Sequence, residues 1–304
     1  MRIVFMGTPD FAVPSLRQLI QDGHEIVGVY TQPDRPKNRG MKLTPSPVKV
    51  VALEHDLPVF QPRTMKDEAV QAELRSLAPE LVAVAAYGQI LPRAVLEIPS
   101  LGCVNVHSSL LPKYRGAAPI NWAVINGETE TGVTIMEMAE GLDSGDIILQ
   151  ASTRIDLNES VEQLHDRLAG MGAELLGQAV KEIAAGTETR TPQDETQYTY
   201  APMLSRAMSP IDWNRTALEI HNQIRGLLPW PATTMELQGT KFKVFASLLT
   251  GETEEQPAGM VLGADKIGIR VVCGDGGILC VTEVQAPGKK RMKAVDYLRG
   301  HPIL

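Results

Sequence analysis

The first 190 residues alternate short apolar runs with helix-like patterns, and this alternation limits the possible folds more than any other feature. Four runs are nearly continuous in Val, Ile and Ala, as strands buried on both faces of a sheet are; they span residues 2–6, 25–30, 81–86 and 103–107. Helix-like patterns lie between them at 13–21, 47–54 and 66–77. Strands joined by helices in this order predict an open, mostly parallel, Rossmann-like α/β sheet.

The remainder of the chain extends this sheet and then changes character. Residues 131–138 and 146–155 indicate a β-pair, and a long helix is expected from 160 to about 185, where Ser160 and Gln163 have the spacing of a capping box. One more helix, at 215–227, precedes short strand-like runs at 241–246, 259–262, 267–272 and 277–284, which predict a small antiparallel barrel. We therefore expect domains at 1–188 and 206–304, joined by a linker at 189–205.

Composition and cysteine usage indicate the compartment. No apolar run reaches the roughly 18 residues of a membrane span. The N-terminus reads MRIVFMGTPDF and lacks the pattern of a signal peptide. Cys103, Cys273 and Cys280 form no CxxC motif and cannot all pair, which favours a reducing environment. We expect a cytoplasmic protein that does not bind a membrane.

The net charge of −7 argues at first against a nucleic-acid partner, but the charge is unevenly distributed. Residues 206–304 carry 12 Lys and Arg against 10 Asp and Glu, whereas the rest of the chain has a net charge of −9. Four of these cations fall within GKKRMK, residues 288–293. Such a short cluster is either a solvated loop or a phosphate-binding one.

Common nucleotide and metal motifs are missing from the sequence. The first β–α turn, GTPDF, has one glycine where a dinucleotide fingerprint has three. There is no GxxxxGK[ST] phosphate loop, and no cluster of His, Cys, Asp and Glu has a zinc-site spacing. The sequence therefore supports no NAD, FAD, P-loop or metal site, and we expect no metal.

The residues best suited to chemistry are Asn105 and His107, which end the fourth predicted strand. They share a face, and open α/β sheets bind ligands at the carboxyl ends of their strands. An amide donor and an imidazole there are able to stabilise an oxyanion and move a proton, as acyl transfer requires. An acidic partner for His107 is expected within EGLDSGD; Asp143 is the candidate, and the pattern leaves Asp146 and Glu140 open.

The segments NVHSSLLPKYRGAAPINWA (105–123) and MAEGLDSGDI (138–147) resemble the signature of the folate-dependent formyltransferases. Three further segments extend the match: MGTPDFAVPSL (6–16), PDRPKNRGMKLTPSPVK (33–49) and SPIDWNRTALEIHNQIRGLLPWPAT (209–233). The resemblance covers nearly the whole chain and is nearest to members that formylate methionyl initiator tRNA. It implies a Rossmann-like formyltransferase domain, a C-terminal OB-like barrel that contacts tRNA, 10-formyltetrahydrofolate as formyl donor, and a monomer.

The resemblance also implies roles for individual residues. The catalytic positions are Asn105, His107 and Asp143. The folate-binding positions are Ser109, Leu110, Leu111, Pro112, Tyr87, Gln89, Ile90 and Leu91. The tRNA-binding positions are Arg35, Arg39 and Lys42 in the loop that meets the acceptor end, and Lys289, Lys290, Arg291 and Lys293 in the C-terminal cluster.

Other functions remain open from the sequence. A folate-dependent enzyme that formylates a sugar-nucleotide amine would share the three catalytic positions and the C-terminal domain type; the loop at 33–49 and the basic cluster argue against it. A glycinamide-ribonucleotide formyltransferase would be shorter and lack the second domain. A non-catalytic folate- or RNA-binding protein on the same scaffold would not need all three catalytic positions.

Overall fold

The computed structural model describes residues 1–37 and 42–301 and divides into two compact units. The first unit comprises Met1–Gly116, Thr131–Thr153 and His165–Tyr200; the second comprises Ala117–Glu130, Arg154–Leu164 and Ala201–Leu304. Both units are thus assembled from separate stretches of the chain. The linear division into 1–188 and 206–304 stays a prediction.

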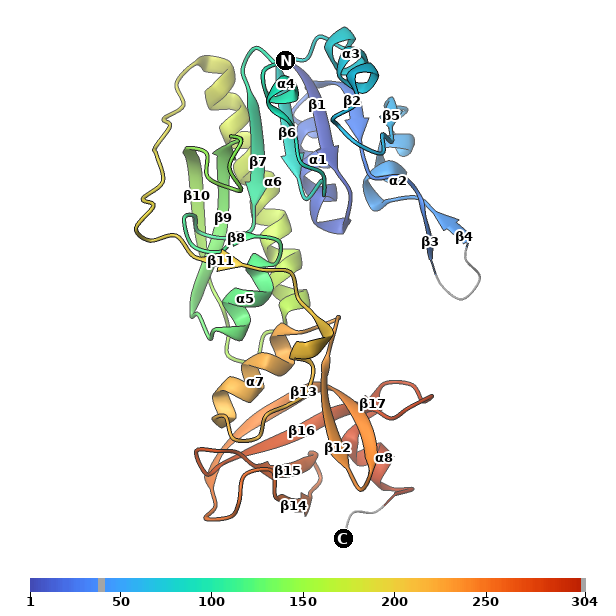
Figure 1. Ribbon diagram of the computed structural model, residues 1–304, viewed down its shortest axis with the longest axis vertical. Helices are drawn as coiled ribbons and strands as arrows, with labels where there is room; N and C mark the ends of the chain where they lie inside the picture. Colours follow the sequence, from blue (N-terminus) through green and yellow to red (C-terminus); the bar gives the residue numbers. More distant parts are fainter. Residues whose placement is uncertain (38–41, 302–304) are drawn as a thin grey trace. The chain divides into compact units, whose positions relative to one another are not determined.

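The sheet of the first unit has the strand order β10–β9–β7–β6–β1–β2–β5 (Figure 1). Its parallel part consists of β1 (Arg2–Gly7), β2 (Glu25–Tyr30), β5 (Val59–Phe60), β6 (Leu81–Ala85) and β7 (Cys103–His107). β9 (Glu130–Glu137) runs antiparallel to β7, and β10 (Ile147–Arg154) lies at the edge. The Rossmann-like sheet predicted from the apolar runs is confirmed, with strand ends within one residue for the four runs.

Helices pack on both faces of this sheet because its strands are apolar on both sides. α1 (Val13–Gln21) and α6 (Val161–Ala185) lie side by side, with Lys181 of α6 3.5 Å from Asp22 at the end of α1. On the other face, Val4 and Met6 of β1 pack in one buried cluster with Leu74 of α3 (Glu68–Ser76). α2 (Pro47–Glu54) and α4 (Arg93–Leu96) complete the helices of this unit.

The capping box predicted at the start of α6 is confirmed. The backbone N–H of Ser160 donates to Gln163 Oε1 at 2.9 Å, and the backbone N–H of Gln163 donates to Ser160 Oγ at 3.3 Å. Two N–H groups that the first helical turn leaves unpaired are satisfied in this way.

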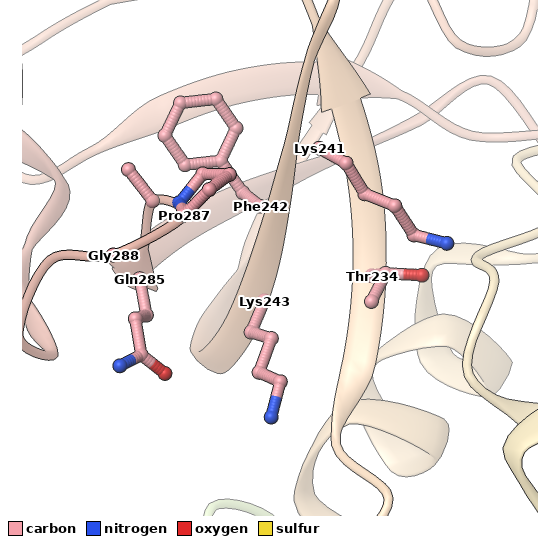
Figure 2. A pocket seen from close by; sticks show the side chains of 8 residues that line it. Thr234, Lys241, Phe242, Lys243, Gln285, Pro287 and Gly288 are labelled. Atoms are coloured by element: carbon pink, nitrogen blue, oxygen red, sulfur yellow. The ribbon is translucent and has the colours of Figure 1, made fainter.

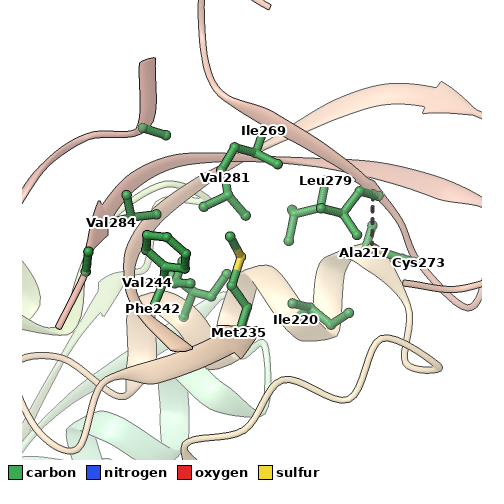
Figure 3. Packing of buried hydrophobic residues seen from close by; sticks show 14 residues of the cluster. Ala217, Ile220, Met235, Phe242, Val244, Ile269, Cys273, Leu279, Val281 and Val284 are labelled. Atoms are coloured by element: carbon green, nitrogen blue, oxygen red, sulfur yellow. Dashed lines mark hydrogen bonds between the residues drawn. The ribbon is translucent and has the colours of Figure 1, made fainter. Parts of the chain in front are cut away.

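The second unit contains a curled antiparallel sheet of the OB-like type, as predicted. Its strand order is β12 (Thr233–Leu237), β13 (Thr240–Thr253), β16 (Gly277–Gln285), β15 (Ile269–Val272) and β14 (Val261–Ala264), with β17 (Met292–Lys293) paired to β16. α7 (Ala217–Gly226) contributes Ile220 to the core, where it meets Met235, Phe242 and Leu279 (Figure 3).

Several short elements complete the chain. They are the 3-10 turns at Asp10–Ala12 and Arg206–Met208, the ribbon β3 (Arg35–Lys37) and β4 (Lys42–Thr44), the pair β8 (Arg115–Gly116) and β11 (Tyr200–Ala201), and the helices α5 (Pro119–Ile125) and α8 (Ala294–Leu298). Within residues 1–37 and 42–301, no helix combines the length and the apolar character that crossing a bilayer requires.

The C-terminal strands depart most from the sequence-based boundaries. β12 was not predicted, because TTMEL shows little apolar periodicity. β13 was expected at 241–246 but continues to Thr253. Its pairing to β16 shifts register between Val244 and Ala246 and again beyond Leu249, so the strand bends and the alternation of side chains is interrupted.

Candidate active site

The strand order of the first unit reverses between β1 and β6. β2 and β5 continue from β1 on one side, whereas β6 and β7 lie on the other. Open α/β sheets bind ligands at such a switch point, beyond the carboxyl ends of the strands. The segments after β1 and β6 meet there, since the hydroxyl of Thr8 donates to the carbonyl of Tyr87 at 2.9 Å. β7 is parallel to β6 and ends at the same edge.

Asn105 and His107 lie two residues apart on β7, opposite Met136 and Thr134 of β9. His107 is 5% exposed, and its Nε2 lies 2.9 Å from the carbonyl oxygen of Tyr114. Because a carbonyl only accepts, Nε2 carries a proton and Nδ1 is the nitrogen left for chemistry. Asn105 is partly exposed, and its amide makes no hydrogen bond to any residue that the structure describes. The amide is therefore open to a ligand.

Asp143 is the acidic residue that lies beside His107, rather than Glu140 or Asp146. Its Oδ2 is 3.7 Å from His107 Nδ1, which is ion-pair distance, and accepts the backbone N–H of Gly116 at 2.8 Å. The backbone of Asp143 has a φ of 48°, in the left-handed region that ordinary residues avoid. The structure thus brings Asn105, His107 and Asp143 together at the end of β7, and their catalytic roles stay a prediction.

The segment from Ser109 to Pro112 is fixed to the neighbouring strands. Thr134 Oγ1 donates to the Ser109 carbonyl at 2.7 Å and accepts the backbone N–H of Leu111 at 3.1 Å. Gln150 Nε2 donates to the Leu111 carbonyl at 2.8 Å. Thr134 and Gln150 were not singled out in the sequence, since nothing about a Thr or Gln in a strand distinguishes such a role.

Exposure separates the predicted folate residues into two groups. Side chains that reach the surface belong to Leu110, Pro112, Gln89 and Ile90, and buried ones to Ser109, Leu111, Tyr87 and Leu91. Tyr87 is 2% exposed, and its hydroxyl lies 3.4 Å from Met65 Sδ, so its ring is part of the core. Burial raises the pKa of this phenol. The buried members support the loop, and a folate role for these eight residues stays a prediction.

The N-terminal cations of the predicted tRNA site are only partly described. Arg35 is exposed on β3. The side chain of Lys42, at the start of β4, and the whole of Arg39 lie outside the described residues.

The C-terminal cations are exposed around β17, at Lys289, Lys290, Arg291 and Lys293. Arg291 is fixed by Glu283 at 2.7 Å, and its guanidinium lies 4.6 Å from the ring centroid of Phe245. The hydrogen bond to Glu283 raises the pKa of Arg291. Arg291 is therefore preorganised, whereas Lys289 and Lys290 project from a loop.

A hollow of about 420 Å³ in the second unit adjoins this loop at Gly288. Figure 2 shows the side chains that line it. Lys241 and Lys243 of β13 line it, while Phe242 between them is a core residue. Lys243 pairs across the sheet with Gln285. These two lysines were not singled out from the sequence. The alternation Lys-Phe-Lys in a strand was the available signal, because it places both cations on one face.

The cysteines are free and buried, and burial disfavours their thiolate form. Burial raises the pKa of Cys103 to about 12 and those of Cys273 and Cys280 to about 11. The thiols are therefore protonated at neutral pH, and the thiolate is the reactive form.

Comparison with known proteins matches both parts of the chain. The formyl transferase family model matches residues 1–180, and that of the formyl transferase C-terminal domain matches residues 203–302. Among solved structures, an N-formyltransferase from Helicobacter canadensis in complex with folinic acid and dTDP-3-aminofucose has a TM-score of 0.68 at 22% identity, over 93% of this chain and 98% of that one. HypX from Aquifex aeolicus in complex with tetrahydrofolic acid has a TM-score of 0.65 at 17% identity, over 98% of this chain and 47% of that one.

Curated relatives are much more similar in sequence. The methionyl-tRNA formyltransferase of Trichlorobacter lovleyi is 49% identical over 99% of this chain and 95% of its own length. Those of Alkaliphilus oremlandii and Clostridioides difficile are 49% and 46% identical over 100% of this chain, and over 97% and 98% of their own lengths. This chain belongs to the methionyl-tRNA formyltransferase family.

Proposed function

We propose that the protein transfers the formyl group of 10-formyltetrahydrofolate to the α-amino group of methionyl initiator tRNA, giving formylmethionyl-tRNA for translation initiation. The observation that carries this proposal is the similarity of 46–49% identity over at least 99% of the chain, which includes the second unit. The N-formyltransferase whose structure contains dTDP-3-aminofucose has the same fold at 22% identity, and this supports a common scaffold only.

In this proposal Asn105 and His107 stabilise the negative charge that develops on the formyl oxygen when the amine attacks. The Asn105 amide has no partner among the described residues, so its N–H groups are free to donate. The Nε2 proton of His107 is held by the Tyr114 carbonyl, and this fixes the ring. Protonated Nδ1 is then the second donor to the oxyanion.

Asp143 supports this arrangement and takes part in proton movement. Its carboxylate lies 3.7 Å from Nδ1 of His107, so it faces the nitrogen left for chemistry and helps to orient the ring. The attacking amine must lose a proton as the new C–N bond forms. Asp143 is placed to accept that proton directly or through one water molecule, and proton return to the departing folate nitrogen completes the transfer.

We place the formyl donor at the edge of the sheet beside Asn105. The free amide of Asn105 and the partly exposed side chains of Leu110, Pro112 and Gln89 offer polar and apolar contacts there. The bound folate supplies the formyl group. We assign the rigid, buried members of these segments, Ser109 and Leu111, to holding the loop in place.

For the tRNA, we propose that the exposed cations contact phosphates and orient the acceptor stem without reading its sequence. The cations of the second unit are Lys289, Lys290, Arg291 and Lys293, extended by Lys241 and Lys243 at the hollow. In the first unit, Arg35, Arg39 and Lys42 are assigned to the acceptor end. We further propose that the enzyme is cytoplasmic and acts as a monomer. Light scattering of the purified protein checks the monomeric state.

One assay tests the proposed function. A formyl-labelled folate donor is offered to methionyl initiator tRNA, to methionyl elongator tRNA and to an amino-sugar nucleotide. We expect label on the initiator tRNA. Label on the sugar nucleotide alone would show that the chain is a sugar formyltransferase, and no label on any acceptor would contradict a formyl transfer function.

A further inference from the structure

The segment that follows α6 returns to the candidate active site through Gln193. Its Nε2 donates to the carbonyl of Asp143 at 2.8 Å and to the carbonyl of Gly145 at 2.7 Å. Its Oε1 accepts from Nε and Nη2 of Arg115 at 3.0 and 2.7 Å. Every side of this amide is therefore occupied by the two chain segments that surround His107.

The orientation of the Gln193 amide is determined by chemistry. A guanidinium only donates, so Oε1 faces Arg115; a carbonyl only accepts, so Nε2 faces Asp143 and Gly145. Arg115 is 5% exposed and is held in turn by Glu195, with Nη2 2.7 Å from Oε1. Arg115 thus fixes the amide, and the amide fixes the loop.

Asp143 needs such a restraint. Its φ of 48° is unfavourable for a residue with a side chain, and the preceding loop residues Gly141 and Leu142 are exposed. Without a partner for its carbonyl, the peptide is able to rotate toward an ordinary conformation. That rotation would move the carboxylate away from Nδ1 of His107 and from the N–H of Gly116.

Arg115 also lies between Tyr114 and Gly116, the two residues whose backbone groups bond to His107 and Asp143. The Tyr114 carbonyl accepts from His107 Nε2, and the Gly116 N–H donates to Asp143. The same segment of residues 193–199 also secures Tyr114, whose backbone N–H donates to Thr199 Oγ1 at 2.8 Å. One hydrogen-bonded network therefore fixes the positions of His107 and Asp143 relative to each other.

We propose that Gln193 is a positioning residue for formyl transfer: its amide N–H group holds the Asp143 carbonyl, and through it the carboxylate at His107. This inference rests on the proposed function of Asp143. It assigns the positioning of Asp143 to Nε2 of Gln193, the donor side of the amide. This role differs from a general anchoring of the segment that follows α6. The anchoring is made by the acceptor side and by Glu195.

Gln193→Glu tests this assignment because it separates the two sides of the amide. The carboxylate still accepts from Arg115, with the gain of an ion pair, but it no longer donates to the two carbonyls. We expect kcat to fall by about tenfold to a hundredfold, as for a misplaced reactive group. The KM values for folate and for tRNA should stay close to wild type, whereas the melting temperature is expected to fall, because two hydrogen bonds are lost and a carboxylate oxygen then faces two carbonyl oxygens. Unchanged kcat would overturn the proposal.

Glu195→Gln is the matched control, because it weakens the hold on Arg115 without touching the Asp143 loop. Glu195 is largely exposed, with 64% of its side chain accessible, and kcat is expected to remain at the wild-type value. A kcat loss in this control as large as that of Gln193→Glu would mean that anchoring alone matters, and would overturn the proposal.

The double variant with Asp143→Asn separates failure of this inference from failure of the proposed function. If Gln193 acts through Asp143, Gln193→Glu costs little further activity in the Asp143→Asn background. The full loss appearing again in that background would contradict a positioning role through Asp143. Asp143→Asn itself retaining wild-type kcat would instead refute the catalytic role assigned to Asp143.

Discussion

Replacing Asn105 with Ala tests the proposed oxyanion site with little disturbance of the free protein. The Asn105 side chain is partly exposed, and its amide makes no hydrogen bond to any described residue. Removing it leaves no protein donor or acceptor unpaired. By contrast, removing His107 would leave the Tyr114 carbonyl without the imidazole that now donates to it at 2.9 Å.

Because the Asn105 amide can be removed without breaking a hydrogen bond in the free protein, the substitution should affect catalysis more than stability. Stability should change by no more than about 1 kcal/mol, since no buried hydrogen bond is lost. The activation free energy should rise by about 3–4 kcal/mol, a factor of about 10² to 10³ in kcat, which is the usual effect of removing one oxyanion donor. Substrate binding is largely spared if the amide contacts the formyl oxygen more strongly in the transition state.

The assay is steady-state formylation of methionyl initiator tRNA, with kcat and both KM values determined for wild type and Asn105→Ala, together with a urea unfolding curve for each. A kcat within about threefold of wild type would refute the oxyanion role, because it corresponds to less than about 1 kcal/mol. A loss of activity matched by a loss of folded protein would also contradict the reasoning.

Two further predictions concern the second unit. Alanine substitution of Lys289, Lys290, Arg291 and Lys293 together should weaken tRNA binding and reduce its dependence on salt. The slope of log binding constant against log salt concentration should fall by about 0.9 for each phosphate that the protein no longer neutralises. An unchanged slope in binding titrations would rule out phosphate binding by these residues. His221 is 3% exposed, with Nε2 2.9 Å from the Leu157 carbonyl, and burial lowers its pKa below 6.5. As the pH is lowered, His221 is therefore protonated at a higher pH in the unfolded chain than in the folded protein. The free energy of unfolding should then fall as the pH drops below about 6.5, by at most about 1.4 kcal/mol per pH unit from this residue. Urea unfolding at pH 7 and 5.5 should show a weaker pH dependence for His221→Gln than for wild type, whereas exposed His55→Gln serves as control; equal pH dependence of wild type and His221→Gln would contradict the assignment.

The sequence predicts the parallel strands well because burial on both faces leaves continuous apolar runs. β2 and β7 match their predicted limits, at Glu25–Tyr30 and Cys103–His107, and Asn105 and His107 were placed on one face by period alone. The curled sheet is harder to predict, because shifts in the pairing of β13 with β16 interrupt the alternation and the polar end of β13 resembles a loop.

The candidate site, too, is predicted only in part from the sequence. The choice among Glu140, Asp143 and Asp146 depends on the path of a loop whose backbone takes a left-handed conformation at Asp143, and no periodic pattern encodes that path. Gln193 lies in a segment predicted as a linker, where a single Gln carries no distinguishing signal. Its role becomes visible only through hydrogen bonds with residues about 50 and 80 positions away.

The most direct test of the central claim is recovery of formylmethionine from methionyl initiator tRNA after incubation with formyl donor, for wild type and for His107→Ala in parallel, with folate affinity measured by equilibrium titration. We predict that wild type yields formylmethionine, and that His107→Ala binds folate as wild type does but loses most turnover. Absence of formylmethionine with wild type, or near wild-type turnover in His107→Ala, would contradict the account.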